Sequence, residues 1–263
     1  MNGAIMRASM RAGKPLYGTM LTALHPTRHL AMLHQLRLDF AVIDTEHAPL
    51  GRAEAAEMAA RIALFGCVPI IRTADRTALS ACQALDAGAH GVIVPYCESR
   101  QQVELLVRSV RHHPVKGARL DAHARIPKKT AAALAQAHRN TVIIIGIESE
   151  AALDALDDIS SVEGIDGIFV GTQDLSYSLG FPNELDATVV VQAFTAILET
   201  CARRGLPAAI WPLSLSRAAA WSSRGMSLLL HSSDYRAAYE GLRNDFAVLR
   251  ESAEAPTKRS RRR

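Results

Sequence analysis

The sequence predicts a (β/α)₈ barrel, and three observations lead to this prediction. Eight short apolar runs of strand type are spread along the 263 residues. Stretches with helical spacing of apolar residues separate most of these runs. Polar side chains gather just after the runs and not before them, which is where a parallel barrel carries its active site. An open, doubly wound sheet is the alternative that the same alternation allows.

The predicted strands are mostly continuous apolar runs, without alternation of polar and apolar residues. This pattern is typical of parallel strands that are buried on both faces. The predicted strands are residues 16–21, 40–44, 68–72, 91–95, 142–147, 167–171, 207–211 and 227–231.

Helices are predicted between these runs, with Gly88 ending one of them and Ser99 and Gln102 forming a capping box at the start of another. A long basic stretch, residues 112–130, interrupts the alternation. Long irregular loops in compact domains are usually functional or disordered. The predicted helices are residues 52–65, 76–87, 101–110, 151–159 and 187–204.

Charge is distributed unevenly along the chain. The formal net charge is +4, but five positive charges lie within the last six residues, KRSRRR. The basic character therefore belongs to a tail and does not indicate a nucleic-acid-binding face.

With 49% hydrophobic residues the chain can form a sizeable core. We expect one domain over residues 1–250 and a basic, disordered tail over 251–263.

The four cysteines fit no zinc-binding spacing, and nothing in the sequence indicates secretion. No run of 18 apolar residues occurs, so we expect no membrane-spanning segment. The start of the chain also lacks the apolar segment of a signal peptide. We expect reduced thiols and a cytoplasmic location.

Acidic residues follow two neighbouring predicted strands. Glu148 comes just after residues 142–147, and Asp174 comes shortly after residues 167–171. Two unpaired carboxylates that converge on one point would repel each other. A divalent cation with a preference for oxygen ligands would remove this repulsion. The alternative is that each acid caps a helix or pairs with an arginine.

A histidine and an arginine stand at two other strand ends. His47 follows Asp44 by three residues, and a nearby carboxylate can prepare an imidazole for acid/base catalysis. A loop histidine bonded to the backbone is the alternative. Arg72 ends an apolar run, so a buried guanidinium there needs an anionic partner. That partner is either a substrate oxygen or an internal acid such as Asp86.

The lysines argue against one mechanism. Lys14, Lys116, Lys128, Lys129 and Lys258 all lie outside the predicted strands. A barrel enzyme that forms a Schiff base usually draws its amine from a strand. Carbanion chemistry in this chain would therefore use a metal ion to accept the negative charge.

Three stretches, taken in order, resemble the HpcH/HpaI aldolase family of metal-dependent (class II) pyruvate aldolases. DFAVIDTEHAPL is similar to its Asp-x-Glu-His-(Ala/Gly) signature. VPIIRTADRTALSACQALDAGAHGVIVPYCES resembles the family's arginine strand and the segments that follow it. IGIESEAALDALDDISSVEGIDGIFVGTQDLSYSLGFP resembles the strand and helix that carry its metal-binding acids. The resemblance implies a barrel of the phosphoenolpyruvate/pyruvate-domain type.

The resemblance implies roles for individual residues. Glu148 and Asp174 would bind the metal. Arg72 would stabilise the enolate, and His47, oriented by Asp44, would act as acid and base.

The remaining implied residues would support or bind the substrate. Asp86 would be a polar support near the catalytic residues. Main-chain amides around Asp174 would hold the carboxylate of a 2-oxo acid. The residues expected to bind substrate are Gly171, Thr172, Gln173, Asp174 and Arg119.

The chain departs from the family pattern at four places in the pocket. Gly146 replaces a common glutamine, and Thr172-Gln173 replaces a Pro-Ala or Pro-Gly pair. Leu120 replaces the last glycine of a G-x-R-G loop, and Met20 replaces an aromatic residue. We expect the metal–enolate chemistry to be kept and the recognition of substrate to differ.

The resemblance implies a carbon–carbon lyase that cleaves or forms 4-hydroxy-2-oxo acids. Its cofactor would be Mg²⁺, Mn²⁺ or Co²⁺, and its partners a 2-oxo acid and an aldehyde. It also implies a homo-oligomer, hexamer or trimer, that exchanges C-terminal helices. The alternatives are oxaloacetate decarboxylation or another bond-forming step through the same enolate, and a barrel without catalytic activity.

Overall fold

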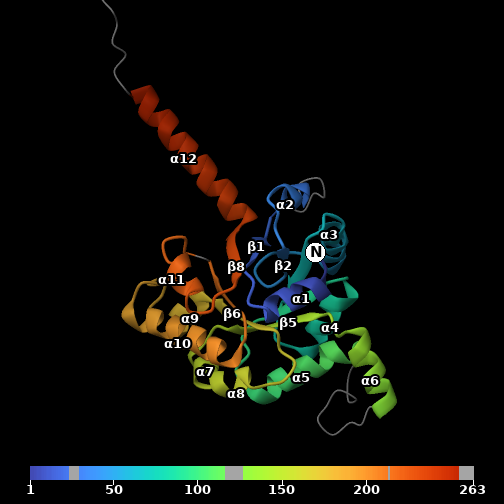
Figure 1. Ribbon diagram of the computed structural model, residues 1–263. Coiled ribbons are helices and arrows are strands. Elements are labelled where there is room, and N and C mark those ends of the chain that lie inside the picture. The colour runs from blue at the N-terminus through green and yellow to red at the C-terminus, as the bar shows by residue number, and fades with distance from the viewer. Residues whose placement is uncertain (24–29, 116–126, 213, 255–263) are drawn as a thin grey trace, which may run out of the picture.

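The computed structural model is a barrel of eight parallel strands surrounded by helices (Figure 1). It describes residues 1–23, 30–115, 127–212 and 214–254. The strands are β1 (Leu16–Leu21), β2 (Phe40–Asp44), β3 (Val68–Arg72), β4 (Gly91–Val94), β5 (Val142–Ile147), β6 (Gly167–Gly171), β7 (Ala208–Trp211) and β8 (Leu228–Ser233).

The strands follow one another around the barrel in chain order. β1 pairs with both β2 and β8, and each later strand pairs with the next as far as β7. Ala208 on β7 forms a parallel bridge with Met226, just before β8, so the ring is nearly closed. The predicted (β/α)₈ barrel is confirmed, and the open sheet is excluded.

Helices connect the strands, and the predicted ones are present with small differences in their bounds. The predicted helix over residues 151–159 is two short helices that meet at Ala155. The helices are α1 (Gly3–Arg11), α2 (Ala31–Gln35), α3 (Arg52–Leu64), α4 (Ala78–Asp86), α5 (Arg100–Arg111), α6 (Lys128–Ala137), α7 (Glu150–Asp154), α8 (Leu156–Ser160), α9 (Thr172–Ser178), α10 (Thr188–Arg204), α11 (Ala218–Ser222) and α12 (Asp234–Glu254).

The interior of the barrel is closed at one end by α1. Met6 and Met10 of this helix are buried in the same apolar cluster as Leu16, Val68 and Val142, which lie at or near the starts of their strands. The N-terminal ends of the strands are therefore covered by the chain itself. The carboxyl ends are left for polar side chains, as the position of the active site in barrels of this class requires.

The outer face of the barrel is exposed where β1 pairs with β8, a place that we call the open seam. Every residue of β2 to β6 is buried, but Tyr17 on β1 and His231 on β8 are exposed. The helix after β8, α12, extends away from the barrel instead of packing on this seam (Figure 1). Exposed apolar side chains run along it: Tyr235, Tyr239, Leu242, Phe246, Val248 and Leu249.

α12 also passes the domain boundary predicted at residue 250. It continues to Glu254, so the first residues of the predicted tail are helical. Residues 255–263 lie outside the described part of the chain. None of the described helices is long and apolar enough to span a membrane. The four cysteines are buried and form no disulfide.

Candidate active site

Glu148 is a buried carboxylate at the carboxyl end of β5. Its Oε2 accepts a hydrogen bond of 3.2 Å from the main-chain N–H of Tyr96, whereas its Oε1 has no hydrogen-bond partner. Burial, followed by the charge of Glu46, raises the pKa of Glu148 to about 8, and Asp174 adds to this rise. Arg72 acts in the opposite direction. A cation beside Oε1 would relieve the cost of ionising this group.

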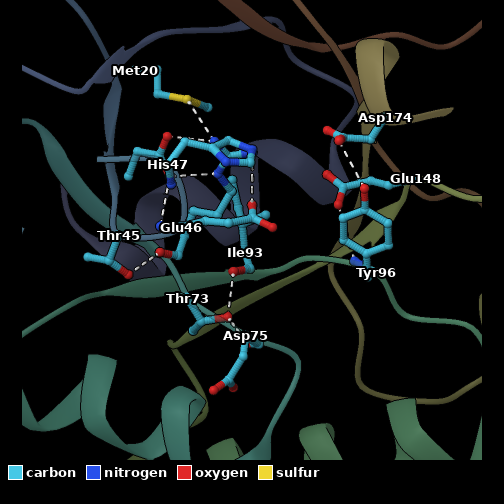
Figure 2. Close-up of polar contacts among 12 residues, drawn as sticks. Met20, Thr45, Glu46, His47, Thr73, Asp75, Ile93, Tyr96, Glu148 and Asp174 are labelled. Atoms are coloured by element: carbon cyan, nitrogen blue, oxygen red, sulfur yellow. Dashed lines mark hydrogen bonds and ion pairs between the residues drawn. The ribbon is translucent and has the colours of Figure 1, made fainter. Parts of the chain in front are cut away.

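Asp174 lies in the first turn of α9, directly after β6. Its Oδ1 accepts a hydrogen bond of 2.9 Å from the phenol of Tyr96. Tyr96 therefore contacts both acids predicted to bind a metal, and Figure 2 shows the two carboxylates together beside its ring. Burial and then the bond to Asp174 raise the pKa of Tyr96, so its phenol stays protonated at neutral pH.

Two glycines make room for this arrangement. A Cβ on Gly171 would lie 2.5 Å from Oε1 of Glu148, so only glycine allows the carboxylate to occupy its position. A Cβ on Gly146 would lie 2.9 Å from both the carbonyl oxygen of Val94 and Cα of Pro95. A side chain at position 146 would therefore clash with the backbone at the end of β4.

Arg72 lies in the barrel interior, with its side chain 1% exposed. Its Nε donates to Oδ1 of Asp44 at 2.9 Å, and its Nη2 donates to Oδ2 of Asp44 at 2.6 Å. Its Nη1 lies 3.2 Å from Oε2 of Glu46. Burial by itself lowers the pKa of Arg72, but Asp44, Glu46 and Glu148 together raise it above its ordinary value. The guanidinium is therefore a fixed positive charge.

Apolar side chains complete the surroundings of Arg72. Its guanidinium carbon lies 5.8 Å from the ring centroids of both Phe169 and Trp211, within the range of a cation–π interaction. Its Nη2 also lies 3.6 Å from Sδ of Met20. Met20, which replaces the aromatic residue of the family pattern, is thus in direct contact with the predicted catalytic arginine.

The structure corrects the expected relationship between Asp44 and His47. Oδ1 of Asp44 accepts hydrogen bonds from the main-chain N–H groups of Glu46 and His47, at 3.1 and 3.3 Å, and not from the imidazole. The acid nearest the ring is Glu46, whose Oε2 lies 3.7 Å from Nε2 of His47 (Figure 2). Asp44 orients the loop and Arg72, and Glu46 faces the half-exposed imidazole.

Asp86 is not part of this cluster. It ends α4, which leads from the carboxyl end of β3 back to the start of β4, so it lies toward the opposite end of the barrel. Its carboxylate lies 2.8 Å from Nε2 of His113. The acids beside Arg72 are Asp44 and Glu46, which corrects the expectation that Asp86 would serve there.

The expected substrate-binding residues are only partly placed. The hydroxyl of Thr172 donates to the carbonyl oxygen of Trp211 at 2.9 Å, so it links β6 to β7. Gln173 is exposed, beside the partly buried Asp174. Arg119 and Leu120 lie outside the described residues.

Glu46 and Tyr96 contact the candidate site residues but are not among the residues predicted from the sequence. Glu46 is the glutamate of the Asp-x-Glu-His signature, so the sequence did indicate that it lies near the site. Burial raises its pKa despite the nearby charges of Arg72 and His47. Tyr96 comes two residues after β4 and has a positive φ of 49°. Neither the turn nor its contacts leave a pattern in the sequence.

The available oxygen atoms fit a hard divalent cation. Glu148 offers an oxygen without a partner, and Asp174 offers its second carboxylate oxygen, Oδ2. Among the described residues, no three His, Cys, Asp or Glu side chains are grouped to hold a metal ion by themselves. Two carboxylates would leave positions for water or substrate oxygens, which is how Mg²⁺ is commonly bound.

Comparison with known proteins identifies the family. The model of the HpcH/HpaI aldolase/citrate lyase family matches residues 23–211. A hydroxypyruvate/pyruvate aldolase from Rhizorhabdus wittichii is 33% identical over 197 residues, which are 74% of this chain and 78% of that protein.

Solved structures agree with this match. The citrate synthase SbnG is 26% identical, with a TM-score of 0.80 and coverage of 94% of this chain and 98% of that chain. A citrate lyase beta subunit from M. tuberculosis, solved with oxaloacetate and magnesium, has the same fold at a TM-score of 0.56 and 15% identity, with coverage of 86% and 93%. The chain belongs to the HpcH/HpaI aldolase/citrate lyase family.

Proposed function

We propose that the protein is a divalent-metal-dependent class II aldolase that cleaves or forms 4-hydroxy-2-oxo acids through a pyruvate enolate. The observation that carries this proposal is the buried, half-satisfied carboxylate of Glu148, placed beside Asp174 at the carboxyl end of the barrel. A buried acid without a full set of partners is costly unless a ligand completes it.

Glu148 and Asp174 would hold the metal ion, and Mg²⁺, Mn²⁺ and Co²⁺ are the candidates. A divalent cation bound there polarises the keto group of a 2-oxo acid and lowers the energy of its enolate. Tyr96 keeps one oxygen of each carboxylate occupied, so that the other oxygens are available as ligands.

Arg72 would stabilise the negative charge on the enolate oxygen. Its two bonds to Asp44 and its contact with Glu46 hold the guanidinium in one orientation before substrate binds. A charge that is already oriented needs no reorganisation when negative charge develops in the transition state. The buried surroundings strengthen this interaction relative to water.

His47 would carry the proton. In cleavage, its imidazole accepts the proton of the 4-hydroxyl group while the C3–C4 bond breaks. The aldehyde leaves, and the electron pair of the broken bond becomes the enolate. The enolate then takes a proton at C3 from the His47 imidazolium, which gives pyruvate and restores the neutral imidazole. The half-exposed ring and the neighbouring Glu46 carboxylate suit a group that exchanges protons with solvent.

The segment Gly171–Asp174 would receive the carboxylate of the 2-oxo acid. It combines a glycine, which brings the backbone close to Glu148, with main-chain N–H groups at the start of α9. Gln173 is exposed there and replaces part of a Pro-Ala or Pro-Gly pair of the family, so it would contribute to recognition. The substrates are accordingly small molecules, a 2-oxo acid and an aldehyde.

We also propose that copies of the chain exchange α12. The open seam of β1 and β8 and the exposed apolar side chains of α12 suit one another, but α12 extends away from the barrel (Figure 1). Covering both with a second copy would remove a large apolar surface from water. A trimer or a hexamer would allow this exchange. The four buried cysteines form no disulfide, which suits a reducing compartment such as the cytoplasm.

A second candidate is the use of the same enolate for bond formation after decarboxylation of oxaloacetate. The similarity to SbnG, which is named a citrate synthase, favours the bond-forming part of this candidate. A barrel without activity is the third candidate, and the retained set of Glu148, Asp174 and Arg72 argues against it.

One assay separates these candidates. Pyruvate release is measured from a panel of 4-hydroxy-2-oxo acids and from oxaloacetate, with EDTA and after addition of Mn²⁺ or Mg²⁺. Release from the hydroxy acids that EDTA abolishes and metal restores supports the aldolase. Turnover of oxaloacetate alone supports the second candidate. Full activity after removal of all metal, or no turnover at all, contradicts the proposal.

A further inference from the structure

We propose that Tyr96 is a positioning residue that holds Glu148 and Asp174 in the arrangement in which they bind a divalent cation. The inference rests on the proposed metal site and adds a residue to it. Tyr96 would not be a metal ligand or a catalytic group. It would determine how tightly the two carboxylates bind the ion.

Tyr96 is the one residue that hydrogen-bonds to both acids within the described chain. Its main-chain N–H donates to Oε2 of Glu148, and its phenol donates to Oδ1 of Asp174. The three residues follow three consecutive strands, β4, β5 and β6. One residue therefore links the two ligands across neighbouring strands. It engages one oxygen of each carboxylate and leaves Oε1 of Glu148 without a partner.

The backbone of Tyr96 adopts an unfavourable conformation to make both contacts. Its φ of 49° lies in the left-handed region, which bulky side chains rarely occupy. Such residues persist where the surrounding structure holds them, and they gather at functional sites. In this conformation the N–H points to one acid while the side chain reaches the other.

Two hydrogen bonds hold this turn. Nη1 of Arg76 donates to the carbonyl oxygen of Tyr96 at 3.2 Å, and the N–H of Cys97 donates to the carbonyl oxygen of Gly146 at 3.1 Å. The missing side chain of Gly146 lets the backbone of Val94 and Pro95 approach β5 closely. A side chain at position 146 would clash with this backbone, so glycine is compatible with the observed position of the Tyr96 turn.

The two hydrogen bonds should favour metal binding by orienting the ligands. A donor that bonds to a carboxylate stabilises its charged form, and it also limits the rotation of the group. Partners of metal ligands of this kind typically change metal affinity by about 10- to 100-fold. The contribution of the phenol can be tested by itself, because a phenylalanine at position 96 keeps the ring and the backbone and loses only the hydrogen bond to Asp174.

The test is the Mn²⁺ affinity of the full-length Tyr96→Phe variant, measured by titration calorimetry on metal-free protein. We expect about 10- to 100-fold weaker binding, with an unchanged melting temperature of the metal-free protein. We also expect pyruvate release to return close to the wild-type kcat at saturating Mn²⁺. Such recovery identifies a positioning role, since loss of a catalytic group would persist at saturation.

The control is Tyr177→Phe. Tyr177 lies on α9, the same helix as Asp174, and its hydroxyl accepts a hydrogen bond from Asn183 at the surface. This variant loses a phenol from the same helix without touching either carboxylate, so its Mn²⁺ affinity should equal that of the wild type.

Glu148→Gln separates the two levels of the proposal. Loss of Mn²⁺ binding in Glu148→Gln together with wild-type affinity in Tyr96→Phe would overturn the role of Tyr96 and leave the metal site standing. Wild-type affinity in Glu148→Gln would overturn the metal site and the role of Tyr96 with it. Loss in Glu148→Gln, with weakening in Tyr96→Phe and none in Tyr177→Phe, supports both.

Discussion

Asp44 and Arg72 form a buried, two-point ion pair at the carboxyl ends of adjacent strands. Two hydrogen bonds of 2.9 and 2.6 Å join the planar guanidinium to the two carboxylate oxygens, and both side chains are 1% exposed. The residues are register partners on β2 and β3, so the sheet itself brings their side chains together. This pair fixes the direction of the charge that we assign to enolate stabilisation.

Removing the acid of this pair should destabilise the protein. We expect Asp44→Ala to lower the free energy of unfolding by about 3–5 kcal/mol, because a buried guanidinium loses its main partner. Urea denaturation of metal-free protein measures this change. Asp158→Ala, at an exposed position of α8, should change it by less than about 0.5 kcal/mol. Equal stability of the two variants would show that the pair contributes little.

Replacing the arginine should separate turnover from metal binding. In Arg72→Lys the charge is kept, but the two-point geometry is lost, because lysine cannot form the parallel bonds of a guanidinium. We expect kcat to fall by about 10²- to 10³-fold, the usual effect of removing an oriented donor to a developing oxyanion. The Mn²⁺ affinity should change only slightly. A kcat close to that of the wild type would refute the assignment of Arg72.

Stability of the metal-free protein should fall as the pH rises. Burial and the nearby acids raise the pKa of Glu148 from 4.5 to about 8. Between these values the folded protein keeps the proton on Glu148 while the unfolded chain releases it. The folded state then binds more protons, so raising the pH favours unfolding until the pH passes about 8. Melting temperatures of EDTA-treated protein from pH 5 to 9 measure this decline.

Glu148→Gln is the matched variant for this pH dependence. Glutamine has nearly the same shape but no proton to lose, so the decline between pH 4.5 and 8 should become smaller. The variant should also fail to bind Mn²⁺ while remaining folded. Melting curves that respond to pH in the same way in both proteins would contradict the assigned pKa.

Charges on α12 should break the proposed assembly. Leu242 and Phe246 lie one turn apart on this helix, and both side chains are more than half exposed. We expect the double variant Leu242→Asp/Phe246→Asp to have a smaller mass in solution than the wild type, because the exchanged surface would no longer be apolar. Light scattering after size-exclusion chromatography measures the mass. Asn244→Asp, on the same helix, should leave it unchanged, and equal masses for wild type and double variant would exclude exchange through this surface.

Much of the barrel could be predicted from the sequence. Strands buried on both faces are continuous apolar runs, and β1, β2, β3, β5 and β6 have the predicted bounds. The helices that were not predicted from spacing are α1, α2, α6, α9, α11 and α12. α9 is brief, which leaves little periodicity to detect. In α12, by contrast, the apolar residues recur every three or four residues, so the sequence did contain the pattern of an amphipathic helix: Tyr235, Tyr239, Leu242, Phe246 and Leu249.

The sequence by itself determined the class of fold and which polar residues stand at the strand ends, among them Glu148, Asp174, Arg72 and His47. The tertiary structure alone decided which of these touch one another. Asp44 bonds to Arg72, and Glu46 lies beside the His47 ring. Asp86 lies toward the other end of the barrel, beside His113, and Tyr96 hydrogen-bonds to both acids. The reason is physical. The polarity of a residue indicates whether it is buried, and this can be read from the sequence around it. A side-chain contact depends instead on the register and close approach of strands that are far apart in the chain.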